Sequence, residues 1–238
     1  MRNALAVLTL LATLAFVGSV FVSGPFEGFE AHQLPIPQTD PPIQPAGWAF
    51  SIWGAIYAWL IVSALFGLMR RGDDPEWDKV RVPLIVSLLA GAPWLWVAQR
   101  SPEAAVVLLF VMAAAAIAAL GRAPVWDRWE LRAPVALYAG WLSAASFVAL
   151  GAVLAGHGLL LGPVGWAVVG IAAALLVAVW VAGEPPGAPV YAAAVAWALL
   201  GIAVKNRDAV PPVALLAALG VAVLAVVAVV TAVRQRDF

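Results

Sequence analysis

The chain has 238 residues, of which 64% are hydrophobic and only 11% are charged. A soluble domain carries about 25% charged residues, so this composition excludes an ordinary soluble globular protein. The formal net charge is zero and the basic residues flank apolar segments, so nothing in the composition indicates nucleic-acid binding. The sequence has no cysteine, which excludes disulfides and thiolate metal sites.

Charged residues gather in short patches and leave eight long apolar segments between them. Each segment is about the length needed to cross a hydrocarbon core of roughly 30 Å. A spanning segment must satisfy its own backbone hydrogen bonds in lipid, so these segments are predicted to be helices. We therefore predict an all-α polytopic membrane protein with spans near residues 4–23, 46–68, 82–99, 103–121, 133–155, 161–182, 188–204 and 210–233.

The first span follows Arg2 and ends near Ser23. Its apolar run of about 19 residues is longer than the roughly 7–15 residues of a signal-peptide core, so a retained anchor is expected. If the N-terminus lies inside, ten Lys and Arg residues fall in the cytoplasm and only Arg100, Lys205 and Arg207 fall outside. This positive-inside bias predicts a bacterial inner (plasma) membrane protein with both termini in the cytoplasm.

Two polar segments interrupt the first spans. Residues 24–45 form a Pro-rich, acidic loop, which we expect to close the outer mouth of a pocket. Residues 70–81 mix both signs of charge and are predicted to form a solvated cytoplasmic turn. In the third span, Pro93 favours a kink that opens space beside Trp94 and Trp96.

The sequence offers little catalytic chemistry. No ionisable residue falls in the middle of a predicted span, and no Ser/His/Asp set, carboxylate pair or phosphate-binding loop is present. Arg100 and Glu103 are predicted to pair at a helix end, and the loop residues His32 and His157 are expected to be solvated rather than ligands of a metal. The protein is therefore predicted not to be an enzyme and to hold no metal.

Small polar and small apolar residues within the spans are expected to serve packing. The hydroxyl groups are predicted to bond back to their own helices, at Ser63, Ser87, Ser143, Ser146 and Thr231. The glycines are predicted to allow close helix approach, at Gly54, Gly91, Gly140, Gly151, Gly165 and Gly170.

Aromatic residues are the most informative feature of the chain. Phe50, Trp53 and Tyr57 share one face of the second span, and a second stripe in the fifth span consists of Pro134, Tyr138, Trp141 and Ala145. Aromatic walls suit a flat, largely apolar ligand, because stacking adds to the gain from burying apolar area. The alternative is that these rings serve helix packing and the interfacial aromatic belt.

These residues resemble the TspO/MBR family, the tryptophan-rich sensory proteins related to the translocator protein, or peripheral benzodiazepine receptor. The family's Pro-Pro-x-Trp-x-Phe…Trp-x-x-x-Tyr segment is similar to residues 45–57, although this chain is one residue shorter between Phe50 and Trp53. The family's fifth-helix pattern is matched by the stripe from Pro134 to Ala145. Where the family commonly has a following Asn, this chain has Ala149, so a polar ligand contact is missing.

The resemblance implies a five-helix unit over residues 1–155 and a three-helix extension over residues 156–238. It also implies binding of porphyrin, haem or a similar tetrapyrrole, a sensory, regulatory or transport role, and frequent homodimers. The family's light-driven porphyrin breakdown is a minor enzymatic alternative. No cofactor is expected to be obligatory, and haem or porphyrin is expected as a ligand.

The predicted function is thus binding of a planar hydrophobic ligand between helices, by a receptor or transport-type protein in the lipid bilayer. One wall of the site is predicted to come from Trp48, Phe50, Trp53 and Tyr57, a second from Tyr138, Trp141 and Ala145, and a third from Trp94. Two alternatives stay open: a secondary transporter of a small lipophilic solute, and an assembly subunit that uses the last three spans for docking.

Overall fold

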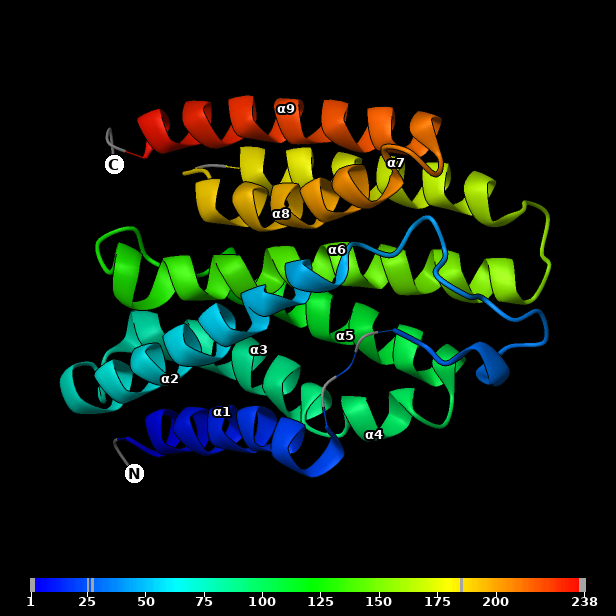
Figure 1. Cartoon of the computed structure of the whole chain (residues 1–238). Coiled ribbons are helices and arrows are strands. Elements are labelled where there is room, and N and C mark those ends of the chain that lie inside the picture. The colour runs from blue at the N-terminus through cyan, green and yellow to red at the C-terminus, as the bar shows by residue number, and fades with distance from the viewer. Residues whose placement is uncertain (1–2, 25, 27, 185, 236–238) are drawn as a thin grey trace.

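The computed structural model describes residues 3–24, 26, 28–184 and 186–235, and every regular element in these ranges is a helix (Figure 1). Eight helical segments of the described chain are long and apolar enough to cross a membrane. Their bounds lie close to the predicted spans, so the prediction of an all-α polytopic membrane protein is confirmed. The segments are Ala4–Ser23, Gly47–Arg70, Pro75–Ala98, Pro102–Leu120, Arg128–Gly156, Pro163–Gly183, Pro189–Asn206 and Pro211–Arg234.

Several spans combine more than one element. The helices are α1 (Ala4–Ser23), α2 (Ile52–Arg70), α3 (Pro75–Gly91), α4 (Trp94–Ala98), α5 (Pro102–Leu120), α6 (Ala133–Gly156), α7 (Pro163–Gly183), α8 (Pro189–Asn206) and α9 (Pro211–Arg234). Two 3₁₀ turns, η1 (Ala31–Gln33) and η2 (Gly47–Ser51), precede α2, and a π-helical turn, η3 (Arg128–Arg132), leads into α6. The break between α3 and α4 falls at Ala92 and Pro93, as predicted from the proline.

The prediction of a solvated turn over residues 70–81 is wrong, because α3 already begins at Pro75. Asp74 caps this helix by accepting a hydrogen bond from the Glu76 amide at 2.9 Å, and Pro75 fits the first turn, where no amide proton is needed. Trp77 and Arg81 are each only 2% exposed. The buried Arg81 guanidinium is well paired, because it donates to the Gly67 carbonyl in the last turn of α2 and to the Arg71 and Gly72 carbonyls, and it pairs with Asp78.

Helix α6 lies at the centre of the bundle. It packs against α5 on one side and against α7 and α8 on the other, so that α1–α5 and α7–α9 form two groups around it (Figure 1). The main chains of α6 and α8 approach closely at Gly140, where an added Cβ would lie 2.5 Å from the Tyr191 carbonyl oxygen. The predicted packing role of Gly140 is thereby confirmed, whereas Gly54 has no atom within reach of an added Cβ.

The loops fall on two opposite sides of the bundle. We call the side that holds residues 3 and 235 the terminus side and the opposite one the cover side (Figure 1). On the terminus side, Asp127 accepts hydrogen bonds from Arg71 Nε at 2.9 Å and from Trp77 Nε1 at 2.7 Å. These contacts join the loop between α2 and α3 to the loop between α5 and η3.

On the cover side, a long loop crosses the bundle from α1 to α2. We call it the cover loop and define it as Phe26 with residues 28–45. Its Ile36 amide donates to the Gly156 carbonyl at 2.8 Å, and Asn206 of α8 donates to the Pro42 carbonyl at 2.9 Å. Ile43 is buried between α6 and α7, because Gly151 and Gly170 leave room for its side chain. The cover loop is thus fastened to α6, α7 and α8.

Most of the predicted hydroxyl contacts are confirmed, but Ser87 differs. Ser143, Ser146 and Thr231 donate to the carbonyl four residues earlier in their own helices. Ser87 of α3 instead donates to the Met112 carbonyl of α5 at 2.8 Å, and the Tyr138 hydroxyl of α6 lies 3.0 Å from the same Oγ. Since Ser87 has a single proton to donate, Tyr138 is the donor in the second contact. Three helices are joined by this chain of hydrogen bonds.

Candidate ligand pocket

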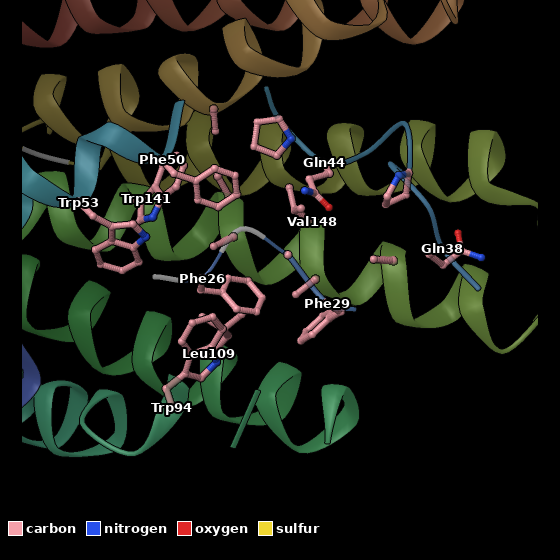
Figure 2. Close-up of a pocket in the computed structure, with 18 of the residues that line it drawn as sticks. Phe26, Phe29, Gln38, Gln44, Phe50, Trp53, Trp94, Leu109, Trp141 and Val148 are labelled. Atoms are coloured by element: carbon pink, nitrogen blue, oxygen red, sulfur yellow. The ribbon is translucent and has the colours of Figure 1, made fainter. Parts of the chain in front are cut away.

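An apolar cavity lies between the cover loop, η2, α5 and α6 (Figure 2). Trp53 of α2 and Trp94 of α4 complete its wall. The cavity volume is about 60 Å³. Its lining includes two amide side chains, Gln38 and Gln44, and is otherwise dominated by aromatic and small apolar groups: Phe26, Phe29, Leu34, Phe50, Trp53, Trp94, Leu109, Trp141, Ala144, Ala145, Val148, Ala149, Ala152 and Ala198.

Three rings from η2, α2 and α6 form one aromatic wall. Trp141 meets Phe50 edge to face with ring centroids 5.9 Å apart, and it meets Trp53 in the same way at 6.1 Å. Trp53 also stacks on Tyr57 at 5.3 Å. These separations are those of favourable aromatic pairs, so the wall is held in shape by its own contacts.

The opposite wall joins the cover loop to α4. Phe26 packs edge to face on Trp94 with ring centroids 4.8 Å apart, and Phe29 packs on Phe26 at 5.5 Å. The Trp94 indole N–H donates to the Ala105 carbonyl at 3.0 Å, which fixes the ring against α5. Both phenylalanines point into the cavity from the cover loop (Figure 2), so the loop fills part of the space that it covers.

Trp141 carries an unsatisfied buried polar atom at the wall of this pocket. Its side chain is 2% exposed, and its Nε1 has no hydrogen-bond partner among the described residues. A buried N–H without a partner costs about 1–3 kcal/mol. The indoles of Trp94 and Trp197 each donate to a main-chain carbonyl, so the unpaired Trp141 donor is a specific feature of the pocket.

A second cavity adjoins the first and shares five of its lining residues: Phe26, Phe50, Trp53, Trp94 and Leu109. Its volume is about 170 Å³, and it extends toward α1 along Phe16 and Tyr57. Phe16 lies 5.6 Å from Tyr57 and 6.0 Å from Trp53, measured between ring centroids. The aromatic cluster thus continues across the α1–α2 contact.

The structure brings together most of the residues that were predicted to form the site. Phe50, Trp53, Trp94, Trp141 and Ala145 line the first cavity, and Tyr57 lines the second. Tyr138 is fully buried and lines neither cavity, because its hydroxyl is held at Ser87. Trp48 is also outside both linings, and it packs edge to face on Trp197 of α8 at 5.0 Å.

Phe16, Phe26 and Phe29 line the cavities but were not predicted from the sequence. The two loop phenylalanines flank Gly28, which has a φ of +127° and at which an added Cβ would lie 2.7 Å from the flexible Gln44 amide. The available sequence signal was a pair of aromatic residues in a polar, Pro-rich loop, because phenylalanine is among the residues most often buried.

No Asp, Glu, His, Lys or Arg is among the described residues that line these two cavities. The predicted Arg100–Glu103 pair is wrong: Glu103 lies 2.8 Å from His157 Nε2, and Arg100 stacks over the Trp96 ring at 4.0 Å. His32 lies 3.2 Å from Glu30 on the surface. In the described part of the chain, no group of three His, Cys, Asp or Glu residues is placed to hold a metal ion.

The fold and this pocket define the protein as a polytopic α-helical membrane protein with an aromatic cavity between its helices. The family model described as TSPO-like protein matches residues 3–230. The chain therefore belongs to the TSPO-like family, and the match includes the last three spans. No curated protein and no solved structure matches the chain significantly.

Proposed function

We propose that the protein binds a planar hydrophobic ligand of the tetrapyrrole class in the aromatic pocket, in a sensory or regulatory role. The observation that carries the proposal is the Trp141 indole, which lines an apolar cavity while its buried N–H has no partner among the described residues. A ligand with a flat apolar face and a peripheral oxygen acceptor would stack on the aromatic wall and satisfy this donor.

The size of the cavities adds a condition to the proposal. Pockets for small molecules measure about 300–1,000 Å³, whereas the two adjoining cavities measure about 60 and 170 Å³. A tetrapyrrole therefore fits only if Phe26 and Phe29 move out with the cover loop. The part of the loop that carries Phe26 and Phe29 lies ahead of the attachment points at Ile36 and Ile43, so this part can act as the gate while the rest stays in place.

The test is a titration of the purified protein in nanodiscs with protoporphyrin IX, followed by quenching of Trp fluorescence and corrected for inner-filter loss. The metal-free macrocycle is the suitable probe, because the two cavities have no His or Cys in their linings. We expect saturable binding, and about tenfold weaker binding in Trp141→Phe. The matched control is Trp180→Phe on the exposed face of α7, which should bind like the parent.

We propose a bacterial inner membrane location in which the terminus side faces the cytoplasm. This side carries most of the basic residues, and the cover side carries Arg100, Lys205 and Arg207. The absence of cysteine allows a direct test with two single-cysteine variants, Asp73→Cys and Gly162→Cys. In intact cells, a membrane-impermeant maleimide should label only the second; labelling of only the first would reverse the topology.

A further inference from the structure

A third cavity, separate from the two cavities of the aromatic pocket, opens on the terminus side between η3, α6, α8 and α9. Its volume is about 450 Å³, which lies within the range of small-molecule sites. It is lined by Arg128, Trp129, Arg132, Ala133, Ala136, Ala188, Pro189, Val190, Ala193, Ala228, Val229, Ala232 and Gln235. None of these residues lines either cavity of the aromatic pocket.

The polar end of this cavity is cationic. Arg128 and Arg132 both line it, and no carboxylate is among its lining residues in the described chain. The Arg128 guanidinium donates a hydrogen bond to the Gln235 carbonyl, at 2.9 Å. Two guanidinium groups without a carboxylate in the same cavity favour an anionic occupant.

Arg132 is buried and incompletely paired. It is 5% exposed, and its Nη atoms donate to the carbonyls of Leu120, Ala123 and Gly187. Its Nε has no hydrogen-bond partner among the described residues. A buried arginine keeps its positive charge, so this part of the cavity lacks a negatively charged hydrogen-bond acceptor.

The remaining walls are apolar and lie along membrane-spanning helices. Val190 and Ala193 of α8 face the cavity together with Ala228 and Val229 of α9. At the rim, Trp129 is 61% exposed, which is the position of a tryptophan at the headgroup level of a bilayer. The cavity therefore joins a cationic end to an apolar groove, which matches the anionic head and apolar tail of an amphiphile.

We propose that this cavity binds an anionic phospholipid from the adjacent leaflet. The phosphate lies between Arg128 and Arg132, and an acyl chain follows the groove between α8 and α9. The apolar groove favours a lipid over a free anion, since a free anion would leave the groove empty. The many other basic residues on this side would draw anionic lipid to the same leaflet.

The test is native mass spectrometry of the full chain after exchange into an equal mixture of phosphatidylglycerol and phosphatidylcholine of the same chain length. We expect preferential retention of one phosphatidylglycerol, reduced about tenfold in Arg128→Gln. The charge-matched control is Arg122→Gln on the same side, whose guanidinium donates to the Ala118 carbonyl of α5; this variant should retain the lipid like the parent. Ala193→Phe, which fills the groove from an exposed position, should also reduce retention.

Two results would overturn the proposal. Equal retention of the two lipids would show that the arginines recognise no anion. Thermal stabilisation by inorganic phosphate as large as that by phosphatidylglycerol would indicate a free-anion site.

Discussion

Trp53 of α2 and Trp141 of α6 meet edge to face, with ring centroids 6.1 Å apart, at the wall of the pocket. The pair joins the N-terminal group of helices to the central helix, so it has a structural role in addition to its proposed role in ligand binding. A double-mutant cycle with Trp53→Leu and Trp141→Leu should give a coupling free energy of unfolding of about 0.5–1.5 kcal/mol. Additive effects on stability would show that the two rings do not interact.

The cover loop should control access to the pocket through Phe26. Replacing this ring by alanine in Phe26→Ala removes its contact with Trp94 and empties part of the cavity. We expect faster association of protoporphyrin IX in stopped-flow quenching experiments, because the closed state loses a stabilising contact. Ile36→Ala is the control, since Ile36 lies in the same loop but does not line either cavity. Equal association rates for Phe26→Ala and the parent would exclude this gate.

Stability should fall in acid through Asp127. Burial alone would raise the pKa of this carboxyl, but the hydrogen bonds from Arg71 and Trp77 lower it, and the net direction is below its ordinary value. A group of this kind contributes stability above its unfolded pKa of about 3.9 and loses that contribution as pH falls through its folded pKa. The thermal midpoint should therefore decrease below about pH 4, and Asp127→Asn should flatten this part of the profile. If the thermal midpoint of Asp127→Asn fell in acid as much as that of the parent, the loss of stability would come from other groups.

Close packing of α6 on α8 should depend on Gly140. An added Cβ would lie 2.5 Å from a main-chain oxygen of α8, and the main chain cannot yield as a flexible side chain can. Gly140→Ala should destabilise the protein by about 2 kcal/mol or more, measured by reversible denaturation in detergent. Gly54→Ala, where the added methyl group meets open space, should be neutral or stabilising. Equal behaviour of the two variants would contradict the close approach of these helices.

Much of the fold was predictable because membrane spans are encoded by a simple physical rule. Lipid requires about 20 apolar residues and a helix in each span, and both requirements are visible in sequence. The rule fails where a helix extends beyond the apolar run. Residues 75–81 are rich in charge, yet they are helical, because Asp74 caps the first turn and the Arg81 guanidinium donates to carbonyls at the end of α2 and just after it.

The candidate site was predictable only in part, for a similar reason. Helical spacing grouped Phe50 with Trp53 and predicted Trp141 on a second wall, because residues on one helix face share their surroundings. The structure instead joins these three rings in one wall. It placed Tyr138 on the same stripe as Trp141, but spacing does not reveal that Ser87 holds this hydroxyl away from both cavities. The contributions of Phe26 and Phe29 depend on how a loop crosses the bundle, which no periodic pattern encodes.

Binding of a planar ligand at the aromatic wall is tested most directly by the equilibrium titration with protoporphyrin IX in nanodiscs. The Trp53→Leu/Trp141→Leu double variant is measured beside the parent, with its folded state confirmed by circular dichroism. We predict saturable binding by the parent that is weakened by more than tenfold in the variant, a change of about 1.4 kcal/mol or more. Non-saturating quenching, or equal affinity in the folded variant, would contradict the proposal and leave these rings a role in packing alone.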